Sequence, residues 1–314
     1  MSNQLERLYV KSPAKVNLYL EVLGVRNNGY HDIRSIVVPV SLYDVLALER
    51  TDKDVRTIID SDALSNNDEM RLINNEDNLA TKAARLLQQE TGCSCGAEIQ
   101  IKKNIPVGGG LGGGSADAAA VLIGLNQLWD LGLPRKRLSE ISLKLGCDVP
   151  AMVCGGTLRM EGLGEKIAPI AVDRDNTGLW IVIVNPCFGV STGDIYSRYS
   201  SVLTSNVIPV SSMVSAVKDG NVELVAKSLF NSLEKTVFRK YPLIEIIAEE
   251  LKKAGAIGVL LSGSGASVFG LGADEKQARE IEKLVNKALG ASIWSRVATT
   301  LPDGVMVAHG PLEA

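Results

Sequence analysis

The segment Pro106-Val107-Gly108-Gly109-Gly110-Leu111-Gly112-Gly113-Gly114-Ser115-Ala116-Asp117 decides the local fold, because six of the seven residues 108–114 are glycines. Glycine costs about 1 kcal/mol relative to alanine inside a helix, so the segment predicts a loop whose backbone a ligand can approach closely. The following residues, 118–129, place apolar side chains at helical spacing. A glycine loop that enters a helix directs N–H groups and the positive end of the helix dipole to one point, which predicts a phosphate site.

Three other interpretations of this loop are weaker. The dinucleotide fingerprint G-x-G-x-x-G is formally present at Gly108, Gly110 and Gly113, but it requires a βαβ unit and an acid closing the next strand. Asp130 has about the required spacing, yet it ends the predicted helix. A P-loop requires Lys-Ser or Lys-Thr after the last glycine, and the next lysine is Lys136. A flexible linker would not lie between an apolar segment and a periodic helix.

Composition limits the class of protein. The chain has 314 residues, 46% of them hydrophobic and 22% charged, which is typical of a soluble globular protein with one large or two ordinary domains. A net charge of −3 gives no reason to expect a nucleic acid or membrane partner. The N-terminal residues contain no signal-peptide core and the chain has no run of 18 apolar residues, so we expect a cytoplasmic protein.

Cysteine and histidine content argues against a metal centre. The five cysteines form no C-x-x-C pair and their number is odd, which predicts reduced thiols rather than a disulfide framework. His31 and His309 are the only histidines in the sequence. We therefore predict no zinc or iron site and name no metal-binding residue, and the sequence leaves open whether a protein side chain contacts a bound metal directly.

Periodicity predicts alternating strands and helices. Residues 8–22 alternate as in a half-buried strand with Pro13 at its entrance, and Lys15 and Asn17 share one of its faces. That face is either a solvated outer surface or part of a site. Further strands are predicted at 36–40, 45–48, 55–59, 99–101, 179–184 and 292–299, with a strand-loop-strand unit at 257–271. Helices are predicted at 79–87 after the capping segment 75–78, at 118–129, at 134–145, within 209–254 and at 274–289, and a loop over 188–196.

Four other segments bear on organisation or on a site. A polar break at 173–178 predicts a domain boundary near residue 170, and hence domains 1–170 and 171–314. Ser262-Gly263-Ser264-Gly265-Ala266 predicts a second loop of backbone donors. Asp148, between a helix end and Pro150, is either an ordinary turn residue or a carboxylate presented by a rigid corner. Gly29-Tyr30-His31 sets two rings beside a turn, which alone is weak evidence.

Taken together, these motifs stand in an order that resembles the GHMP kinase superfamily of galactokinase, homoserine kinase, mevalonate kinase and relatives. The resemblance rests on Pro-Ala-Lys-Val-Asn at 13–17, Pro-x-Gly-Gly-Gly-Leu-Gly-Gly-Gly-Ser at 106–115 and Ser-Gly-Ser-Gly-Ala at 262–266. Asp77-Asn78-Leu79, Gly29-Tyr30-His31 and Gly-Cys-Asp-Val-Pro at 146–150 narrow it to the branch that acts on a cytidine diphosphate methylerythritol. The likeness covers roughly residues 8–275.

The resemblance implies an α/β (α+β) chain with the two-domain GHMP kinase fold and its active site in the interdomain cleft. It implies that the ATP γ-phosphate, with Mg²⁺, is transferred to the tertiary 2-hydroxyl of the methylerythritol unit in isoprenoid precursor synthesis. The partners it implies are this small molecule and, at most, a second copy of the chain in a weak homodimer.

Carried over residue by residue, the resemblance implies roles for particular side chains. Asp148 matches the catalytic aspartate and Lys15 the catalytic lysine. The expected ATP-binding residues are Asn78, Lys103, Pro106, Gly108, Gly109, Gly110, Leu111, Gly112, Gly113, Gly114 and Ser115. The expected substrate-binding residues are Asn17, Tyr30, His31, Asp148, Tyr196, Gly263 and Ser264. The family often has two serines after the second glycine triplet, whereas this chain has Ser115-Ala116, and we expect Asp117 to cap the helix rather than to reach a metal.

The chemistry of these residue types agrees with the implied roles. A tertiary alcohol is a poor nucleophile near neutral pH, and a carboxylate within hydrogen-bond reach can accept its proton as the P–O bond forms. A modest base suffices, because phosphoryl transfer depends mostly on positioning and charge stabilisation. Lys15 beside Asp148 would keep the carboxylate ionised. Tyr30 and Tyr196 could hold the cytosine between their rings, with stacking worth roughly 1–3 kcal/mol per base.

Alternatives remain at this point. Another GHMP kinase, of mevalonate or homoserine type, needs no cytosine slot and would favour Arg or Lys for the substrate carboxylate. A catalytically inactive relative that senses a nucleotide or sugar would have no need of Lys15 and Asp148. An oxidoreductase is disfavoured because the glycine pattern lacks its βαβ context.

Overall fold

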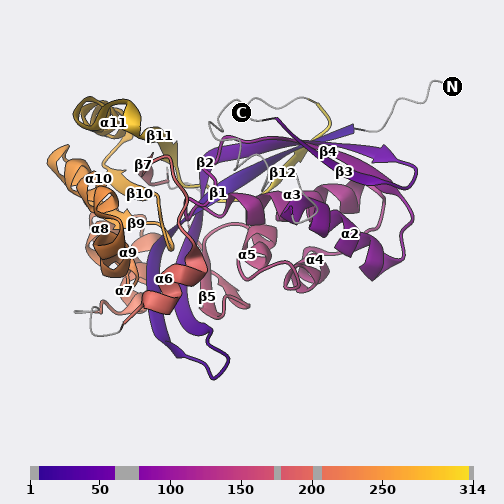
Figure 1. Ribbon diagram of the computed structural model, residues 1–314, viewed down its shortest axis with the longest axis horizontal. Coiled ribbons are helices and arrows are strands. Elements are labelled where there is room, and N and C mark those ends of the chain that lie inside the picture. The colour runs from indigo at the N-terminus through magenta and orange to yellow at the C-terminus, as the bar shows by residue number, and fades with distance from the viewer. Residues whose placement is uncertain (1–6, 61–77, 173–177, 201–206, 311–314) are drawn as a thin grey trace.

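The computed structural model describes residues 7–60, 78–172, 178–200 and 207–310, and these residues form two sheets with helices packed on them (Figure 1). The first sheet has the strand order β12-β1-β2-β4-β3, with β5, β6 and β8 attached, and the second has the order β11-β7-β10-β9. The strands are β1 (Arg7–Val25), β2 (His31–Thr51), β3 (Val55–Asp60), β4 (Gly96–Lys102), β5 (Leu158–Gly162), β6 (Lys166–Pro169), β7 (Trp180–Asn185), β8 (Phe230–Asn231), β9 (Gly258–Leu261), β10 (Val268–Gly272), β11 (Trp294–Thr299) and β12 (Met306–Ala308). The helices are α2 (Leu79–Thr91), α3 (Gly113–Leu128), α4 (Arg135–Ser142), α5 (Val149–Cys154), α6 (Thr192–Arg198), α7 (Val210–Lys218), α8 (Val222–Ser228), α9 (Glu234–Lys240), α10 (Pro242–Lys253), α11 (Glu275–Leu289) and the 3₁₀ turn η2 (Gly290–Ser292).

A long antiparallel ribbon of β1 and β2 runs through both halves of the molecule (Figure 1). Leu8 and Val10 belong to one hydrophobic core, whereas Val16 and Leu18 on the same strand belong to another. The predicted strand is therefore present, but it is buried on both faces rather than half-buried, because elements of both halves cover it. Pro13 lies inside β1 rather than at its entrance, at a register shift that tolerates a residue without an N–H group.

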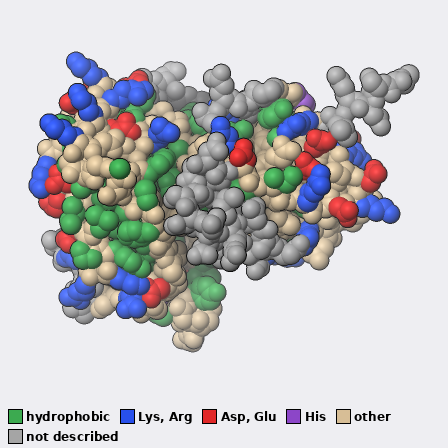
Figure 2. Space-filling view, turned by 45° about the horizontal axis from the view of Figure 1, so that its top comes forward, with side chains coloured by type: hydrophobic (Ala, Val, Ile, Leu, Met, Phe, Trp, Pro, Cys, Tyr) green, Lys and Arg blue, Asp and Glu red, His purple; other side chains and the backbone are tan. Residues whose placement is uncertain are grey.

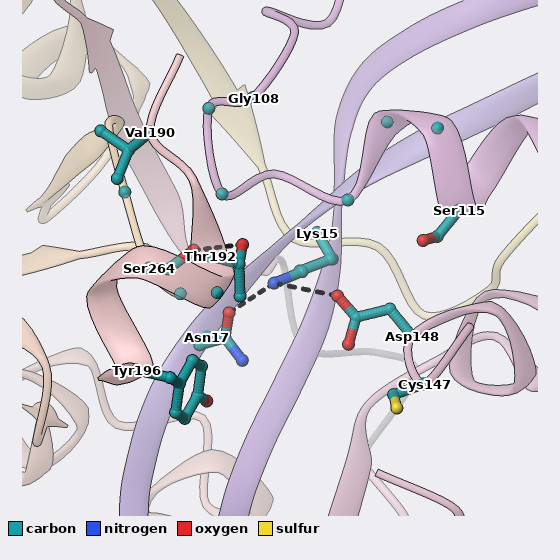
Figure 3. Close-up of a pocket in the computed structure, with 18 of the residues that line it drawn as sticks. Lys15, Asn17, Gly108, Ser115, Cys147, Asp148, Val190, Thr192, Tyr196 and Ser264 are labelled. Carbon is teal, nitrogen blue, oxygen red and sulfur yellow. Dashed lines mark hydrogen bonds and ion pairs between the residues drawn. The ribbon is translucent and has the colours of Figure 1, made fainter. Parts of the chain in front are cut away.

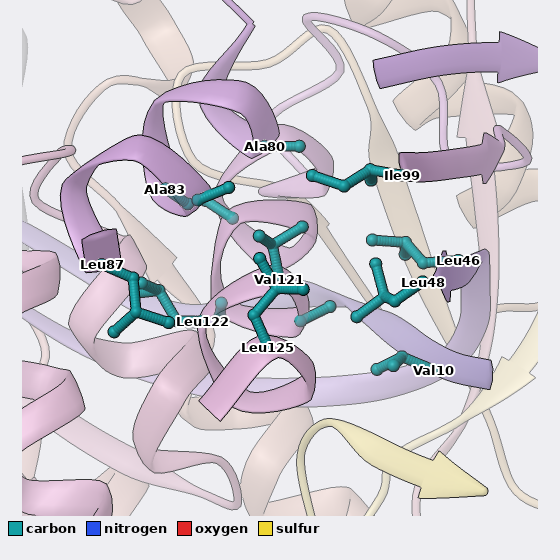
Figure 4. Close-up of a cluster of buried hydrophobic side chains, with 14 of the residues drawn as sticks. Val10, Leu46, Leu48, Ala80, Ala83, Leu87, Ile99, Val121, Leu122 and Leu125 are labelled. Carbon is teal, nitrogen blue, oxygen red and sulfur yellow. The ribbon is translucent and has the colours of Figure 1, made fainter. Parts of the chain in front are cut away.

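The first core lies between the strands of the first sheet and the helices α2 and α3 (Figure 4). Val121, Leu122 and Leu125 of α3 are fully buried, together with Leu46 and Leu48 of β2. The helix predicted at 118–129 is buried on nearly every side, because its alanines and Gly124 let the strands approach it closely. This packing fixes the start of α3, where the glycine loop ends.

The second sheet carries the later half of the chain, with α10 and α11 packed on it. β9 and β10 pair antiparallel around residues 262–267, as the strand-loop-strand pattern predicts. The predicted helical stretch 209–254 contains α7, α8, α9 and α10, interrupted by β8, which pairs with β1. β8 and β12 thus join later segments to the first sheet, and the division at residue 170 stays a prediction.

Several element predictions are corrected by the structure. Ile195 and Tyr196, expected in a loop, lie in α6, whose N-terminus is capped by the Ser191 side chain. The helix predicted at 134–145 ends earlier, at Ser142, and β6 and β12 were not predicted. After α3 the next strand, β5, pairs antiparallel with β2, so the loop does not belong to a dinucleotide-binding βαβ unit. The capping segment 75–77 and most of the polar break at 173–177 lie outside the described residues.

Within the coloured atoms of Figure 2, Lys and Arg side chains are interspersed with Asp and Glu. Among the helices that the structure describes, none has the length and apolar character needed to cross a membrane.

Candidate active site

A cleft of about 890 Å³ lies between the glycine loop, the ribbon and the loop that follows β9 (Figure 3). Its lining comes from both predicted domains, which places it between them. The predicted site residues that line it are Lys15, Asn17, Tyr30, His31, Asn78, Lys103, Pro106, Gly108, Gly109, Gly110, Gly112, Gly113, Gly114, Ser115, Asp148, Tyr196, Gly263 and Ser264. Leu111 is the exception, since its side chain is buried in the second core.

Lys15 is held in place by a chain of hydrogen bonds between β1 and β2. Its ammonium group donates to Oδ1 of Asn17 at 2.6 Å, and Nδ2 of Asn17 donates to Oγ of Ser35 at 2.9 Å. The Ser35 hydroxyl donates in turn to the carbonyl of Tyr19 at 2.7 Å. Lys15 and Asn17 are 4% and 6% exposed, so the face they share is an interior surface of the cleft and not a solvated outer face.

Asp148 faces Lys15 across the cleft (Figure 3). Its Oδ2 lies 3.8 Å from Nζ of Lys15, and 43% of its side chain is exposed. Asp148 occupies the N-cap position of α5, yet its side chain caps no N–H group, and Pro150 stiffens the first turn. The corner therefore presents the carboxylate to the cleft instead of using it in the turn.

The glycine loop is docked against its surroundings through its carbonyl groups. Gly108 accepts from the N–H of Val190 at 3.1 Å, and Gly109 accepts from the N–H of Ser267 at 3.0 Å. Gly110 accepts from the Ser262 hydroxyl at 3.0 Å, and the carbonyl of Leu111 accepts from the N–H of Lys15 at 2.9 Å. Four successive carbonyl oxygens are thus engaged by protein donors. None of these bonds uses a loop N–H group. The N–H groups therefore remain available to donate to an anion.

Two features of the loop depend on the absence of side chains. Gly110 has φ +74, and a Cβ there would overlap the carbonyl oxygen of Ser262, so only glycine fits this close approach. Helix α3 begins at Gly113 with Gly112 as its N-cap residue, and no side chain caps its first N–H groups. The prediction that Asp117 caps this helix is therefore wrong.

Asp117 instead forms a buried ionic cluster with Lys103 and Asp44. Nζ of Lys103 lies 2.7 Å from Oδ2 of Asp117 and also contacts Oδ2 of Asp44. Burial raises the pKa of Asp117, and the positive charge of Lys103 opposes this effect. Lys103, an expected ATP-binding residue, lines the cleft, but two carboxylates hold its ammonium group. Asn78, also expected to bind ATP, caps α2 by accepting from the N–H of Ala80 at 2.8 Å.

Aromatic side chains gather at the other end of the cleft. The ring centroids of His31 and Tyr196 are 5.1 Å apart, and Tyr199 meets His31 edge-on at 6.1 Å. Tyr30 is 60% exposed. Burial raises the pKa of the Tyr196 phenol, and the charge of Asp148 adds to this shift, so Tyr196 stays a neutral donor.

Sequence reasoning missed residues that reach the cleft only through the fold. The Thr192 hydroxyl lies 2.8 Å from that of Ser264 and so joins α6 to the second loop (Figure 3). Val190 and Thr192 belong to no motif, and their only signal is proximity to the predicted Tyr196. Cys147, which also lines the cleft, could have been included because it immediately precedes Asp148.

Comparison with known proteins defines the class. Residues 78–156 match the GHMP kinases N terminal domain, and residues 213–291 match the GHMP kinases C terminal domain. A homoserine kinase from Cytophaga hutchinsonii shares the fold at a TM-score of 0.75 and 22% identity, covering 98% of this chain and 99% of its own. The fold and the two domain matches are those of a GHMP kinase.

More similar relatives identify the family within that class. The chain is 41% identical over 268 residues to 4-diphosphocytidyl-2-C-methyl-D-erythritol kinase of Alkaliphilus oremlandii, covering 85% of this chain and 88% of the relative. It is 39% identical over 287 residues to the enzyme of that name from Symbiobacterium thermophilum, covering 91% and 97%. A crystal structure of 4-(cytidine 5'-diphospho)-2C-methyl-D-erythritol kinase matches with a TM-score of 0.75 and 30% identity, over 93% of this chain and 99% of that one. The chain therefore belongs to the 4-diphosphocytidyl-2-C-methyl-D-erythritol kinases.

Proposed function

We propose that this protein transfers the γ-phosphate of ATP to the 2-hydroxyl of 4-diphosphocytidyl-2-C-methyl-D-erythritol, a step in non-mevalonate isoprenoid precursor synthesis. The observation that carries the proposal is the position of Lys15 and Asp148, 3.8 Å apart, in one cleft with the docked glycine loop. The names of the relatives supply the acceptor, and the site supplies the groups that the reaction needs.

Asp148 acts as the general base. As the new O–P bond forms and the bond to ADP breaks, the proton of the 2-hydroxyl passes to the Asp148 carboxylate. Lys15 lies close enough to stabilise that carboxylate in its charged form and to orient the hydroxyl. Asn17 and Ser35 restrict the lysine to one position, which favours a prealigned reaction geometry.

The glycine loop and the start of α3 bind the phosphates. Their N–H groups and the helix dipole stabilise negative charge before and during transfer. Bound Mg²⁺ would neutralise part of the phosphate charge. The described residues contain no group of three or more His, Cys, Asp or Glu side chains that could hold a metal. Mg²⁺ would thus be held mainly by phosphate oxygens, as is usual for this ion in kinases, and the Ser115 hydroxyl is a candidate protein ligand.

The aromatic end of the cleft binds the cytidine. Tyr30 is exposed at the turn between β1 and β2, and Tyr196 packs on His31, so a base entering here would contact rings on two sides. The sandwich expected between Tyr30 and Tyr196 is part of this proposal. Cytosine specificity would come from the backbone N–H and C=O groups of His31, the first residue of β2.

A panel of acceptor alcohols tests the function. ADP release from the full chain is coupled to a reporter reaction with ATP, Mg²⁺ and one of four alcohols: the cytidylyl methylerythritol, mevalonate, homoserine or galactose. We expect kcat/KM for the cytidylyl methylerythritol to exceed that of the other three by at least about 10³-fold. Preference for another alcohol would reassign the acceptor, and ATP binding without ADP release from any of them would favour the nucleotide-sensing alternative.

A further inference from the structure

The ionic cluster of Asp44, Lys103 and Asp117 lies beside the glycine loop and is not used by the reaction proposed above. These side chains are 0%, 6% and 4% exposed. Moving charged groups out of water costs several kcal/mol per ion unless each is paired and hydrogen-bonded. A cluster this deeply buried next to a site therefore invites a functional explanation, and the contacts of Asp44 provide one.

Asp44 binds the segment of chain that leads into the loop. Its Oδ1 accepts from the N–H of Asn104 at 2.6 Å and from the N–H of Ile105 at 2.9 Å. Nδ2 of Asn104 also donates to the carbonyl of Tyr43 at 2.8 Å. The loop begins at Pro106, so these three bonds attach its entrance to β2. The second oxygen of Asp44 pairs with Lys103, the residue just before this segment.

We infer that Asp44 is a positioning residue for ATP: its carboxylate fixes the entrance of the glycine loop so that the loop N–H groups are already aligned with the phosphates. Glycine loses more conformational freedom on ordering than any other residue, so a loop with six glycines gains most from being fixed before the ligand arrives. The inference rests on the proposed function, because it assigns the loop to the phosphates of ATP.

Asp117 offers a matched comparison within the same cluster. Its Oδ2 accepts from Lys103, but its Oδ1 has no hydrogen-bond partner among the described residues. An amide at position 117 can place its NH₂ group where this unpartnered oxygen lies. An amide at position 44 must point its NH₂ group either at the ammonium of Lys103 or at the two backbone N–H groups. The two substitutions remove the same charge from the same lysine, and only Asp44→Asn sets donor against donor.

The experiment compares Asp44→Asn with Asp117→Asn in the full chain. KM for ATP, KM for the cytidylyl methylerythritol and kcat are measured by ADP release, with circular dichroism and thermal unfolding as checks of folding. We expect Asp44→Asn to raise KM for ATP about tenfold or more while KM for the alcohol changes less than about twofold. Asp117→Asn should keep KM for ATP within about twofold. Equal ATP KM values in the two folded variants would overturn the inference.

A second pair of variants serves if Asp44→Asn does not fold. Asp44→Ala combined with Lys103→Met removes the acceptor without leaving an unpaired lysine, and Asp117→Asn combined with Lys103→Met keeps Asp44 on its two N–H groups. We expect KM for ATP to be at least about tenfold higher in the first double variant. The same KM in both would show that Asp44 is only structural. The unmodified protein decides the proposed function separately, because the panel of alcohols needs none of these variants.

Discussion

The two ends of the cleft are built from different parts of the chain. At the glycine-loop end, where we propose that ATP binds (the nucleotide end), backbone forms the surface, and the carbonyl groups of residues 108–111 are all engaged by neighbouring donors. At the aromatic end, where we propose that the alcohol substrate binds (the acceptor end), side chains form the surface: Tyr30 is largely exposed, and Tyr196 packs on His31. The first end is supported by a buried ionic cluster, whereas the second lies at the turn of a strand ribbon.

This difference separates affinity for phosphate from choice of acceptor. A surface of backbone N–H groups can bind any polyphosphate, and its specificity does not depend on side chains. A Cβ added at one of its glycines can nevertheless disrupt it. A surface of rings can change its preference through single substitutions without disturbing the backbone. Substitutions at the nucleotide end should therefore raise KM for ATP, and substitutions at the acceptor end should raise KM for the alcohol. Substitution of Asp148, which lies between the two ends, should lower kcat alone.

The largest effect is expected from the residue that belongs to neither end. Asp148→Asn keeps the shape of the side chain but removes the proton acceptor, so kcat should fall by roughly 10²-fold or more. KM for ATP and for the alcohol should each change less than about threefold. Asp274→Asn is the control, because Asp274 caps α11 and asparagine caps equally well. Near-normal turnover in Asp148→Asn would mean that another group accepts the proton.

The next effect should appear at the nucleotide end. Gly110→Ala combines a left-handed backbone with overlap on the Ser262 carbonyl, so we expect KM for ATP to rise by roughly 10²-fold. Gly92→Ala is the control: Gly92 has φ +69 at the end of α2, and an added Cβ there meets nothing within 4 Å. Gly92→Ala should be destabilised by a similar backbone strain, and its KM for ATP should not change. Ordinary ATP affinity in Gly110→Ala would argue against a rigidly docked loop.

A smaller effect is expected at the acceptor end. Tyr30→Ala removes one ring from the proposed cytosine slot, so KM for the alcohol substrate should rise about five- to tenfold, in line with the lower range of base stacking. KM for ATP should change less than about twofold. Tyr30→Phe keeps the ring and should retain the original KM in the same steady-state assay. An unchanged KM in Tyr30→Ala would remove this ring from the slot.

The smallest effect is expected from Asp117, in the buried ionic cluster beside the glycine loop, and it should appear in stability rather than in activity. Burial raises the pKa of Asp117 in the folded chain, so the folded state binds this proton more tightly than the unfolded state. Stability due to this group is thus lost as pH rises above the unfolded pKa near 4. Asn cannot ionise, so the unfolding free energy of Asp117→Asn relative to the original chain should increase with pH, by on the order of 1 kcal/mol.

Urea unfolding of both proteins at about pH 5 and about pH 8 measures this difference. An unfolding free-energy difference that does not change between the two pH values would contradict the raised pKa.

Local pattern predicted most elements, and the resemblance to GHMP kinases supplied most of the residues that line the cleft. Prediction failed where the outcome depends on distant packing. Alternation in β1 predicts one exposed face, but it cannot report that a second group of helices covers that face. Asp117 follows the glycines at a position where capping is common, and only the fold brings Lys103 and Asp44 to it. Thr192 meets Ser264 across 72 residues of chain, a separation at which sequence spacing carries no signal.

The ribbon of β1 and β2 has a consequence for how the protein could be divided. Val16, Leu18 and Tyr19 lie on a strand near the start of the chain, yet they complete a core that is built largely from its second half. A fragment that ends near residue 170 would expose these apolar side chains to solvent and would be prone to self-association. Two separately produced pieces would thus regain Lys15 in its working position only by reuniting.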